Sequence, residues 1–118
     1  MSKQEILVID DEPQIRKLLE ITLRNNGYKV ILAATANEGL VLAASHPPDL
    51  ILLDIRLPGK LGTKICEELK QTNCPIPIIL FSAHTQGPNL EHTFCGEAFI
   101  KKPFDIIDLV NTVRLHMH

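Results

Sequence analysis

Three acidic residues in this chain directly follow short apolar runs. Asp10 and Asp11 end the run 6–9, and Asp54 ends the run 50–53. Short runs rich in Ile, Leu and Val between charged residues are typical of strands buried on both faces of a parallel sheet. Chemistry in open α/β sheets collects at the carboxyl ends of the strands, so we expect the three carboxylates at one edge. Carboxylates crowded in this way repel one another unless a cation lies among them, which predicts a divalent metal beside a reactive aspartate.

Two further polar residues follow later apolar runs. Ser82 comes after the run 78–81, and Lys102 comes after the weaker run 97–100. Mg²⁺ (or Mn²⁺) prefers oxygen ligands and retains several waters, so a site of carboxylates and phosphate suits it. A carboxylate can also attack phosphorus to form an aspartyl phosphate, and a hydroxyl and an ammonium group can bind the phosphoryl oxygens. The set therefore favours phosphoryl-transfer chemistry.

Each of these residues also has an ordinary explanation. Asp11 could cap a helix, and Asp54 could begin a turn. Ser82 could be a loop hydroxyl, and Lys102 beside Lys101 could be a solvated charge. The combination at the ends of several strands is much less easily accidental than any single member.

The elements that must position these residues alternate along the chain. A helix is expected from Pro13 to the stop at Asn25-Asn26-Gly27, and another after the capping box at 35–38. Further helices are expected around 65–73 and after Pro103. The last of them would carry an apolar stripe of Ile106, Leu109, Val110, Val113 and Met117. Strands are expected at 6–9, 28–33, 49–53, 78–81 and 97–100. This order predicts an α/β fold with a five-stranded parallel sheet and helices on both faces, doubly wound and flavodoxin-like, in which any helix within 83–97 is short or irregular.

Composition restricts the possible functions less than the acidic, hydroxyl and lysine residues do. With 118 residues, 45% of them hydrophobic and 22% charged, the chain is expected to be one domain over 1–118. The net charge of −2 gives no support for a nucleic-acid surface, and the apolar runs are too short for a membrane span or a signal peptide. A cytoplasmic location is therefore expected. The three cysteines form no CxxC pair and are expected to be reduced.

The motifs together resemble a known family. The matching segments are 7–13, 52–59, 81–83 and 99–104. Over essentially its whole length the chain resembles the receiver domains of bacterial two-component response regulators, including the single-domain chemotaxis regulators. The resemblance implies that Asp54 is the phosphoacceptor, which takes a phosphoryl group from the phosphohistidine of a sensor histidine kinase or phosphotransfer protein.

The same resemblance implies roles for the surrounding residues. Asp11 and Asp54 would bind the metal directly, Asp10 through water and Arg56 through its backbone carbonyl. For phosphate binding and switching the implied residues are Ser82, Ala83, Lys102 and Phe99. The side chains of Arg56 and His84 would tune the rate of dephosphorylation. Lys102 is selected over Lys101 because it directly precedes the proline.

The function implied is a phosphorylation-controlled switch that acts on a downstream effector protein or a fused output domain. Such a domain catalyses its own phosphotransfer and autodephosphorylation without turning over an external substrate, and a phosphorylation-dependent homodimer is compatible with it. A receiver-fold binding module that ignores phosphate is the main alternative, although the acidic, hydroxyl and lysine set is complete. A metal-dependent phosphatase would need a general acid where Arg56 stands, and a flavin-binding module would need a Gly/Ser/Thr-rich phosphate loop after the first strand.

Overall fold

A computed structural model describes residues 3–57, 60–71, 76–82, 98–101 and 104–117. Its centre is a five-stranded parallel sheet with the strand order β2-β1-β3-β6-β7. The strands are β1 (Glu5–Ile9), β2 (Lys29–Ala33), β3 (Leu50–Asp54), β6 (Ile78–Ser82) and β7 (Ala98–Lys101). The helices are α1 (Pro13–Asn25), α2 (Ala36–Ser45), α3 (Gly62–Gln71) and α4 (Ile106–His116). The predicted α/β fold with a parallel sheet is confirmed, and each strand lies within one residue of its expected bounds.

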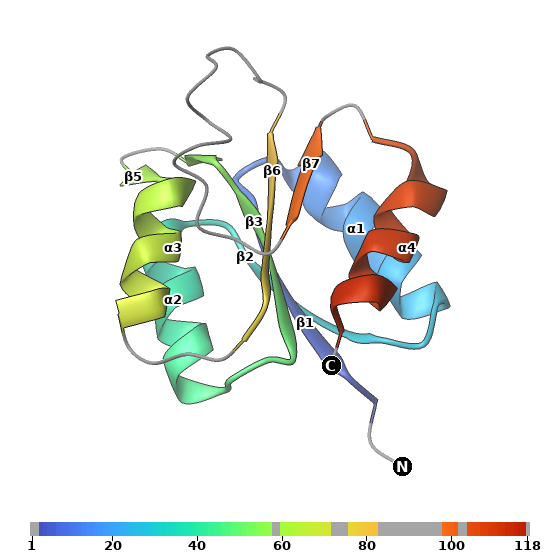
Figure 1. The fold of residues 1–118 in the computed structure, drawn as a ribbon, viewed down its shortest axis with the longest axis horizontal. Coiled ribbons are helices and arrows are strands. Elements are labelled where there is room, and N and C mark those ends of the chain that lie inside the picture. Colours follow the sequence, from blue (N-terminus) through green and yellow to red (C-terminus); the bar gives the residue numbers. More distant parts are fainter. Residues whose placement is uncertain (1–2, 58–59, 72–75, 83–97, 102–103, 118) are drawn as a thin grey trace.

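The helices cover both faces of the sheet, with α2 and α3 on one side and α1 and α4 on the other (Figure 1). Alternate residues of the strands face the two sides, so the sheet separates two apolar cores. On the α2 and α3 side the strands contribute Leu7, Ile9, Ile51, Leu53, Ile78 and Leu80. On the α1 and α4 side they contribute Ile6, Val8, Leu50, Leu52, Ile79 and Phe81. Burial on both faces explains why these runs are apolar without alternation.

The residues expected to begin and end α1 and to begin α2 have these roles in the structure. Pro13 occupies the first turn of α1, and Gly27 follows the end of the helix with a φ of 92°, a conformation that favours glycine. At α2 the Thr35 hydroxyl accepts a hydrogen bond from the Glu38 amide at 3.1 Å. The Glu38 carboxylate accepts one in return from the Ala34 amide at 2.7 Å, one residue before the usual capping-box partner.

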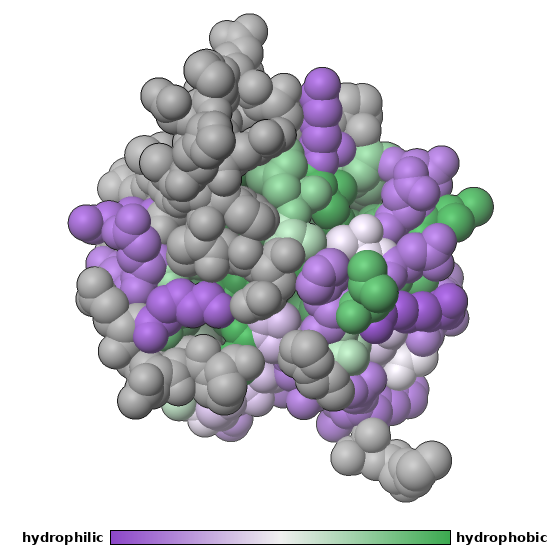
Figure 2. All heavy atoms as spheres, in the orientation of Figure 1, coloured by the Kyte–Doolittle hydropathy of each residue, from purple (hydrophilic) through white to green (hydrophobic). Residues whose placement is uncertain are grey.

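Part of the apolar stripe predicted for the last helix is not buried. Leu109, Val110 and Val113 are buried, but Ile106 is 42% exposed because it is the first residue of α4, directly after the N-cap Asp105. Met117 follows the end of the helix and is partly buried against the core beside α1 and α4. Figure 2 shows apolar side chains scattered among hydrophilic ones on this face. The buried stripe of α4 therefore begins at Leu109 and not at Ile106.

A short antiparallel pair, β4 (Arg56–Leu57) and β5 (Lys60–Leu61), follows β3 and was not predicted from the sequence. Two other expectations need correction or lie outside the described residues. Cys66 is buried and disulfide-bonded, so the prediction that all three cysteines are reduced is wrong. Sequence spacing does not determine which thiols a fold brings together. The predicted short helix within 83–97 lies outside the described residues.

In the described part of the chain, every helix is too short or too polar to cross a bilayer.

Gly39 allows α2 to pack closely on the end of β1. A Cβ atom at this position would lie 2.8 Å from Ile9 Cγ1 and closer still to Ile9 Cδ1. Alanine usually stabilises a helix relative to glycine, but here we expect Gly39→Ala to lower the free energy of unfolding by about 1–3 kcal/mol through overpacking. Urea denaturation would measure the change.

Two variants separate overpacking from a change in helix propensity. Asn37→Ala, at an exposed position of the same helix, should change the stability by less than about 0.5 kcal/mol. Ile9→Val removes the atom nearest to the new methyl group, so it should cost less stability in the Gly39→Ala background than in the wild type. A Gly39→Ala protein as stable as the wild type would contradict the close packing.

Candidate functional site

The sheet topology places the candidate site between β1 and β3. The chain passes from β1 to β2 on one side and then returns to β3 on the other, so the strand order reverses at β1. The carboxyl ends of strands at such a switch point are the usual ligand site of open α/β sheets. Ile9 is the register partner of Leu53, and the next residue on each strand is acidic. The fold thus brings Asp10 and Asp54 to neighbouring positions at this edge.

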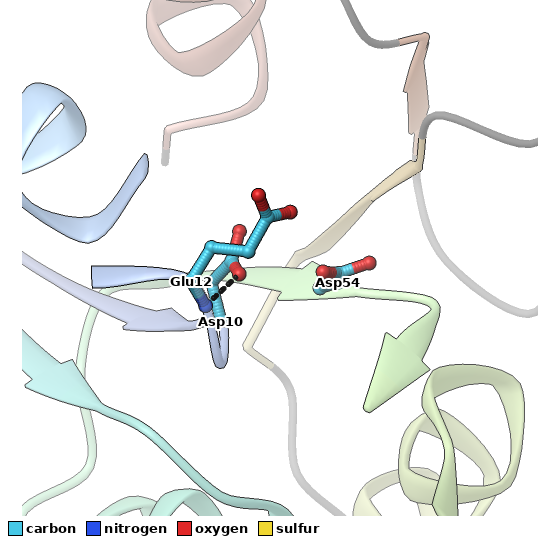
Figure 3. A group of neighbouring side chains, drawn as sticks. All are labelled: Asp10, Glu12 and Asp54. Carbon is cyan, nitrogen blue, oxygen red and sulfur yellow. Dashed lines mark hydrogen bonds between the residues drawn. The ribbon is translucent and has the colours of Figure 1, made fainter. Parts of the chain in front are cut away.

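Three carboxylates meet there. One carboxylate oxygen from each of Asp10, Glu12 and Asp54 lies within 4.8 Å of the other two. Figure 3 shows Asp10 and Glu12 on the turn after β1 and Asp54 at the end of β3. Asp10 is 0% exposed and Asp54 is 4% exposed, whereas Glu12 is exposed to solvent. Two nearly buried acids with an exposed third form a concentrated negative charge that opens to solvent on one side.

The turn that carries Asp10 and Glu12 is held by several hydrogen bonds. The Asp10 amide donates to the Ala33 carbonyl of β2 at 3.1 Å, and the Glu12 amide donates to Asp10 Oδ1 at 2.8 Å. Arg16, one turn into α1, donates from Nη1 to the Asp10 carbonyl oxygen at 2.7 Å. Backbone and side chain of Asp10 are therefore both fixed, which preorganises the acidic turn for a ligand.

Two of the three acids expected at this edge belong to the cluster of carboxylates. Asp10 and Asp54 come together as predicted, but Asp11 is exposed on the turn and is not one of the three clustered acids. Glu12 takes part instead, and the sequence reasoning did not assign it a role. The available signal was Pro13, because a proline at the first helical position makes Glu12 the N-cap and leaves it on the turn that carries Asp10.

The remaining predicted residues lie on neighbouring elements or outside the description. Ser82 is the last residue of β6, next to Phe81, which is the register partner of Asp54. Arg56 begins β4 directly after Ile55. Phe99 in β7 is partly buried and packs against the core beside α2 and α3. Outside the described residues lie Ala83, His84 and Lys102.

Residues on both sides of Lys102 are held near β6. Lys101 is the register partner of Ser82 in the pairing of β7 with β6. The ring of Phe104 packs edge-on against Phe81, with ring centroids 6.5 Å apart and planes at 89°. These two contacts place Lys101 and Phe104 beside β6, the strand that pairs with β3.

The donor set fits a hard divalent cation. All three clustered side chains offer carboxylate oxygens, the ligands that Mg²⁺ and Mn²⁺ accept, and among the described residues no thiolate or imidazole joins them. Nearly complete burial of Asp10 and Asp54 strengthens their interaction with a cation relative to a fully solvated site.

Comparison with known proteins agrees with this geometry. The family described as response regulator receiver domain matches residues 6–114. Among curated proteins, the chain is 33% identical over 116 residues to an uncharacterized transcriptional regulatory protein, YkoG, of Bacillus subtilis, covering 97% of this chain and 51% of that protein. It is 37% identical over 111 residues to the transcriptional regulatory protein KdpE of Mycobacterium tuberculosis, covering 92% and 49% respectively. The chain spans about half the length of these curated relatives.

Solved structures of receiver domains have the same fold over nearly the whole chain. The response regulator protein TrrA of Thermotoga maritima, in complex with Mg²⁺ and BeF, superposes with a TM-score of 0.89 at 31% identity, covering 97% of this chain and 99% of that one. A CheY-like receiver domain protein of Methanospirillum hungatei superposes with a TM-score of 0.89 at 29% identity, covering 97% and 93%.

Proposed function

Because this chain belongs to the response regulator receiver domain family, we propose that it accepts a phosphoryl group on Asp54 in a reaction that needs Mg²⁺ or Mn²⁺. The observation that carries the proposal is the position of Asp54. It is 4% exposed at the switch point of the sheet, with two further carboxylates within 4.8 Å. No ordinary helix cap or turn accounts for acids from the turn after β1 and from the end of β3 meeting at one point.

The transfer itself needs little from the protein beyond positioning and charge. A carboxylate oxygen of Asp54 attacks phosphorus, the bond from phosphorus to the donor's imidazole nitrogen breaks, and the imidazole leaves with the bonding electron pair. A bound divalent ion would neutralise charge on the phosphoryl oxygens. Asp10, Asp11 and Asp54 would hold that ion together with the Arg56 carbonyl. Arg16 fixes the backbone carbonyl of Asp10 through its hydrogen bond.

The residues at the ends of β6 and β7 complete the proposal. Ser82, Ala83 and Lys102 bind the phosphoryl oxygens, with the hydroxyl as a donor and the ammonium as a point charge. Phosphate would draw Ser82 inward, and Phe99, which is partly buried on β7, would turn into the space behind it. The rate of hydrolysis would then depend on the side chains at Arg56 and His84.

The wider role follows the family. Receiver domains interact with histidine kinases and output domains. We assign this chain a sensor histidine kinase or phosphotransfer protein as donor, and an effector protein or fused output domain as its target. Residues 1–118 act as one receiver domain in the cytoplasm. This domain catalyses its own phosphotransfer and autodephosphorylation, and it dimerises when phosphorylated.

Intact-mass measurement tests the proposal. Incubation with acetyl phosphate and Mg²⁺ should add the mass of one phosphoryl group to the protein, and excess EDTA should prevent the addition because charge neutralisation by the metal is lost. Acetyl phosphate replaces the kinase, so the result does not depend on the cognate partner. Equal adduct formation with Mg²⁺ and with EDTA would contradict a metal-dependent site.

A further inference from the structure

The two most exposed large apolar side chains among the described residues lie on the same helix. Leu115 is 78% exposed and Ile107 is 70% exposed, and both belong to α4. A single exposed apolar side chain is ordinary on a protein surface. These two are eight residues apart, which places them about two turns apart on one side of the helix. The helix therefore presents an apolar pair to solvent.

The outer face of α4 is formed by exposed residues that point away from the sheet. They are Ile107, Asp108, Asn111, Arg114 and Leu115. The buried residues of the helix lie on its opposite side. Asn111 is at the centre of the outer face, with one apolar and one charged residue before it and one of each after it. The two charges have opposite signs, because an aspartate precedes Asn111 and an arginine follows it.

This order of residues is complementary to itself when two copies of α4 pack antiparallel. A two-fold axis through Asn111 of both copies places each residue opposite the one that is equally far from Asn111 on the other side. Ile107 then faces Leu115 of the second copy, and Asp108 faces Arg114. Each contact occurs twice, so the pair contains two apolar contacts and two pairs of opposite charge. Parallel packing would instead place like charges opposite each other, which is unfavourable.

The two charges are available for such contacts. Neither Asp108 nor Arg114 forms an ion pair with another described residue. Arg114 donates from Nη2 to Asn26 Oδ1 at 3.1 Å, in an exposed contact with the residue that follows α1. A guanidinium group has five N–H donors, so this contact leaves others for a carboxylate. The contact also restrains the arginine side chain, so less conformational entropy is lost when a second copy binds.

We propose that the outer face of α4 binds the same face of a second copy of this chain, with the two helices antiparallel. No residue of this face belongs to the proposed phosphorylation site, so the pairing goes beyond the proposed function and does not depend on it. One helix face from each copy buries less area than a stable dimer needs, so we expect a dissociation constant on the order of 1 mM. The chain is therefore monomeric at micromolar concentrations. Copies held in one assembly pair appreciably, because effective concentrations there reach about a millimolar.

Two charge-reversal variants test the pairing. Asp108→Arg places like positive charges opposite each other in the pair, and Arg114→Asp places like negative charges there. In a mixture of the two variants, each contact again joins an arginine to an aspartate. We titrate one isotopically labelled variant with the other and follow its amide signals by NMR. The mixed pair should form as tightly as the wild-type pair, whereas each variant alone should self-associate about tenfold more weakly.

An apolar variant tests the other contact. Leu115→Ala should weaken self-association by about tenfold, because the pair loses two apolar contacts. The matched control is Val41→Ala on α2, where the side chain is 65% exposed, and it should self-associate as the wild type does. Asp54→Asn should also pair like the wild type, since the phosphoacceptor takes no part. Normal pairing in a chain that acetyl phosphate does not modify would therefore contradict the proposed function alone.

Three results would overturn the pairing. The first is a mixture of the charge-reversal variants that associates no more tightly than each variant alone. The second is a wild-type spectrum that stays the same up to about 2 mM protein, above the expected dissociation constant. The third is a set of concentration-dependent signals confined to α1 or α2, which would place self-association on another surface.

Discussion

Asp54→Asn should abolish phosphorylation by acetyl phosphate, with a rate lower by at least about a thousandfold. The amide is neutral and has no anionic oxygen to attack phosphorus, although it has nearly the same size as the carboxylate. Asp54 is nearly buried at the end of β3, so a side chain of different size would destabilise the fold more than the loss of the charge does. The loss should therefore be chemical and not a consequence of misfolding.

The measurement is intact mass with peptide mapping of any adduct. Asp108→Asn, an exposed carboxylate in the first turn of α4, serves as the matched control and should be phosphorylated at the wild-type rate. Circular dichroism should show the same secondary structure for both variants. An adduct of wild-type yield in Asp54→Asn, mapped to Asp10 or Glu12, would show that a neighbouring acid is the phosphoacceptor.

Asp10→Asn should weaken metal binding and stabilise the metal-free fold. Asp10 is 0% exposed beside two other acids, and like charges at such separations repel by about 1 kcal/mol in water and more in a protein. We expect the free energy of unfolding in EDTA to rise by about 1–2 kcal/mol. Divalent affinity should fall by about 10–100-fold, as when a residue that orients a metal site is lost.

Urea denaturation with and without Mg²⁺ measures both effects. If the wild type binds Mg²⁺ with a dissociation constant on the order of 1 mM, tenfold excess ion should stabilise it by about 1.4 kcal/mol. Asp10→Asn should gain less than about 0.4 kcal/mol under the same conditions. Asp108→Asn should keep the full Mg²⁺ effect. A lower stability of Asp10→Asn in EDTA would contradict the idea that the acids repel one another in the folded state.

Sequence reasoning succeeded where a residue type has one dominant structural use. Continuous apolar runs identified all five strands, and Pro13, Gly27 and the capping box at Thr35 identified the ends of the first helices. The position of Asp54 also followed from sequence, because a carboxylate after a buried strand can only lie at the carboxyl edge of the sheet. These signals are local, and the packing of the whole chain supports them.

Sequence reasoning did not reach features that depend on three-dimensional proximity. The acids at 10, 11 and 12 are consecutive, and only the turn geometry places Glu12 near Asp54 with Asp11 outside the cluster. The pairing of β4 with β5 depends on contacts across two residues, too few for a periodic pattern. The bond at Cys66 likewise depends on which thiols meet in the fold.

The pairing of β1 with β3 gives the candidate site a further property. Asp10 and Asp54 are far apart in the sequence and become neighbours only through that long-range pairing. A growing chain on the ribosome, or one that has locally unfolded at β3, therefore has no cluster of acids to hold an ion. In a cell, only folded molecules would therefore be phosphorylated. Damaged or incomplete molecules would not use up phosphoryl groups.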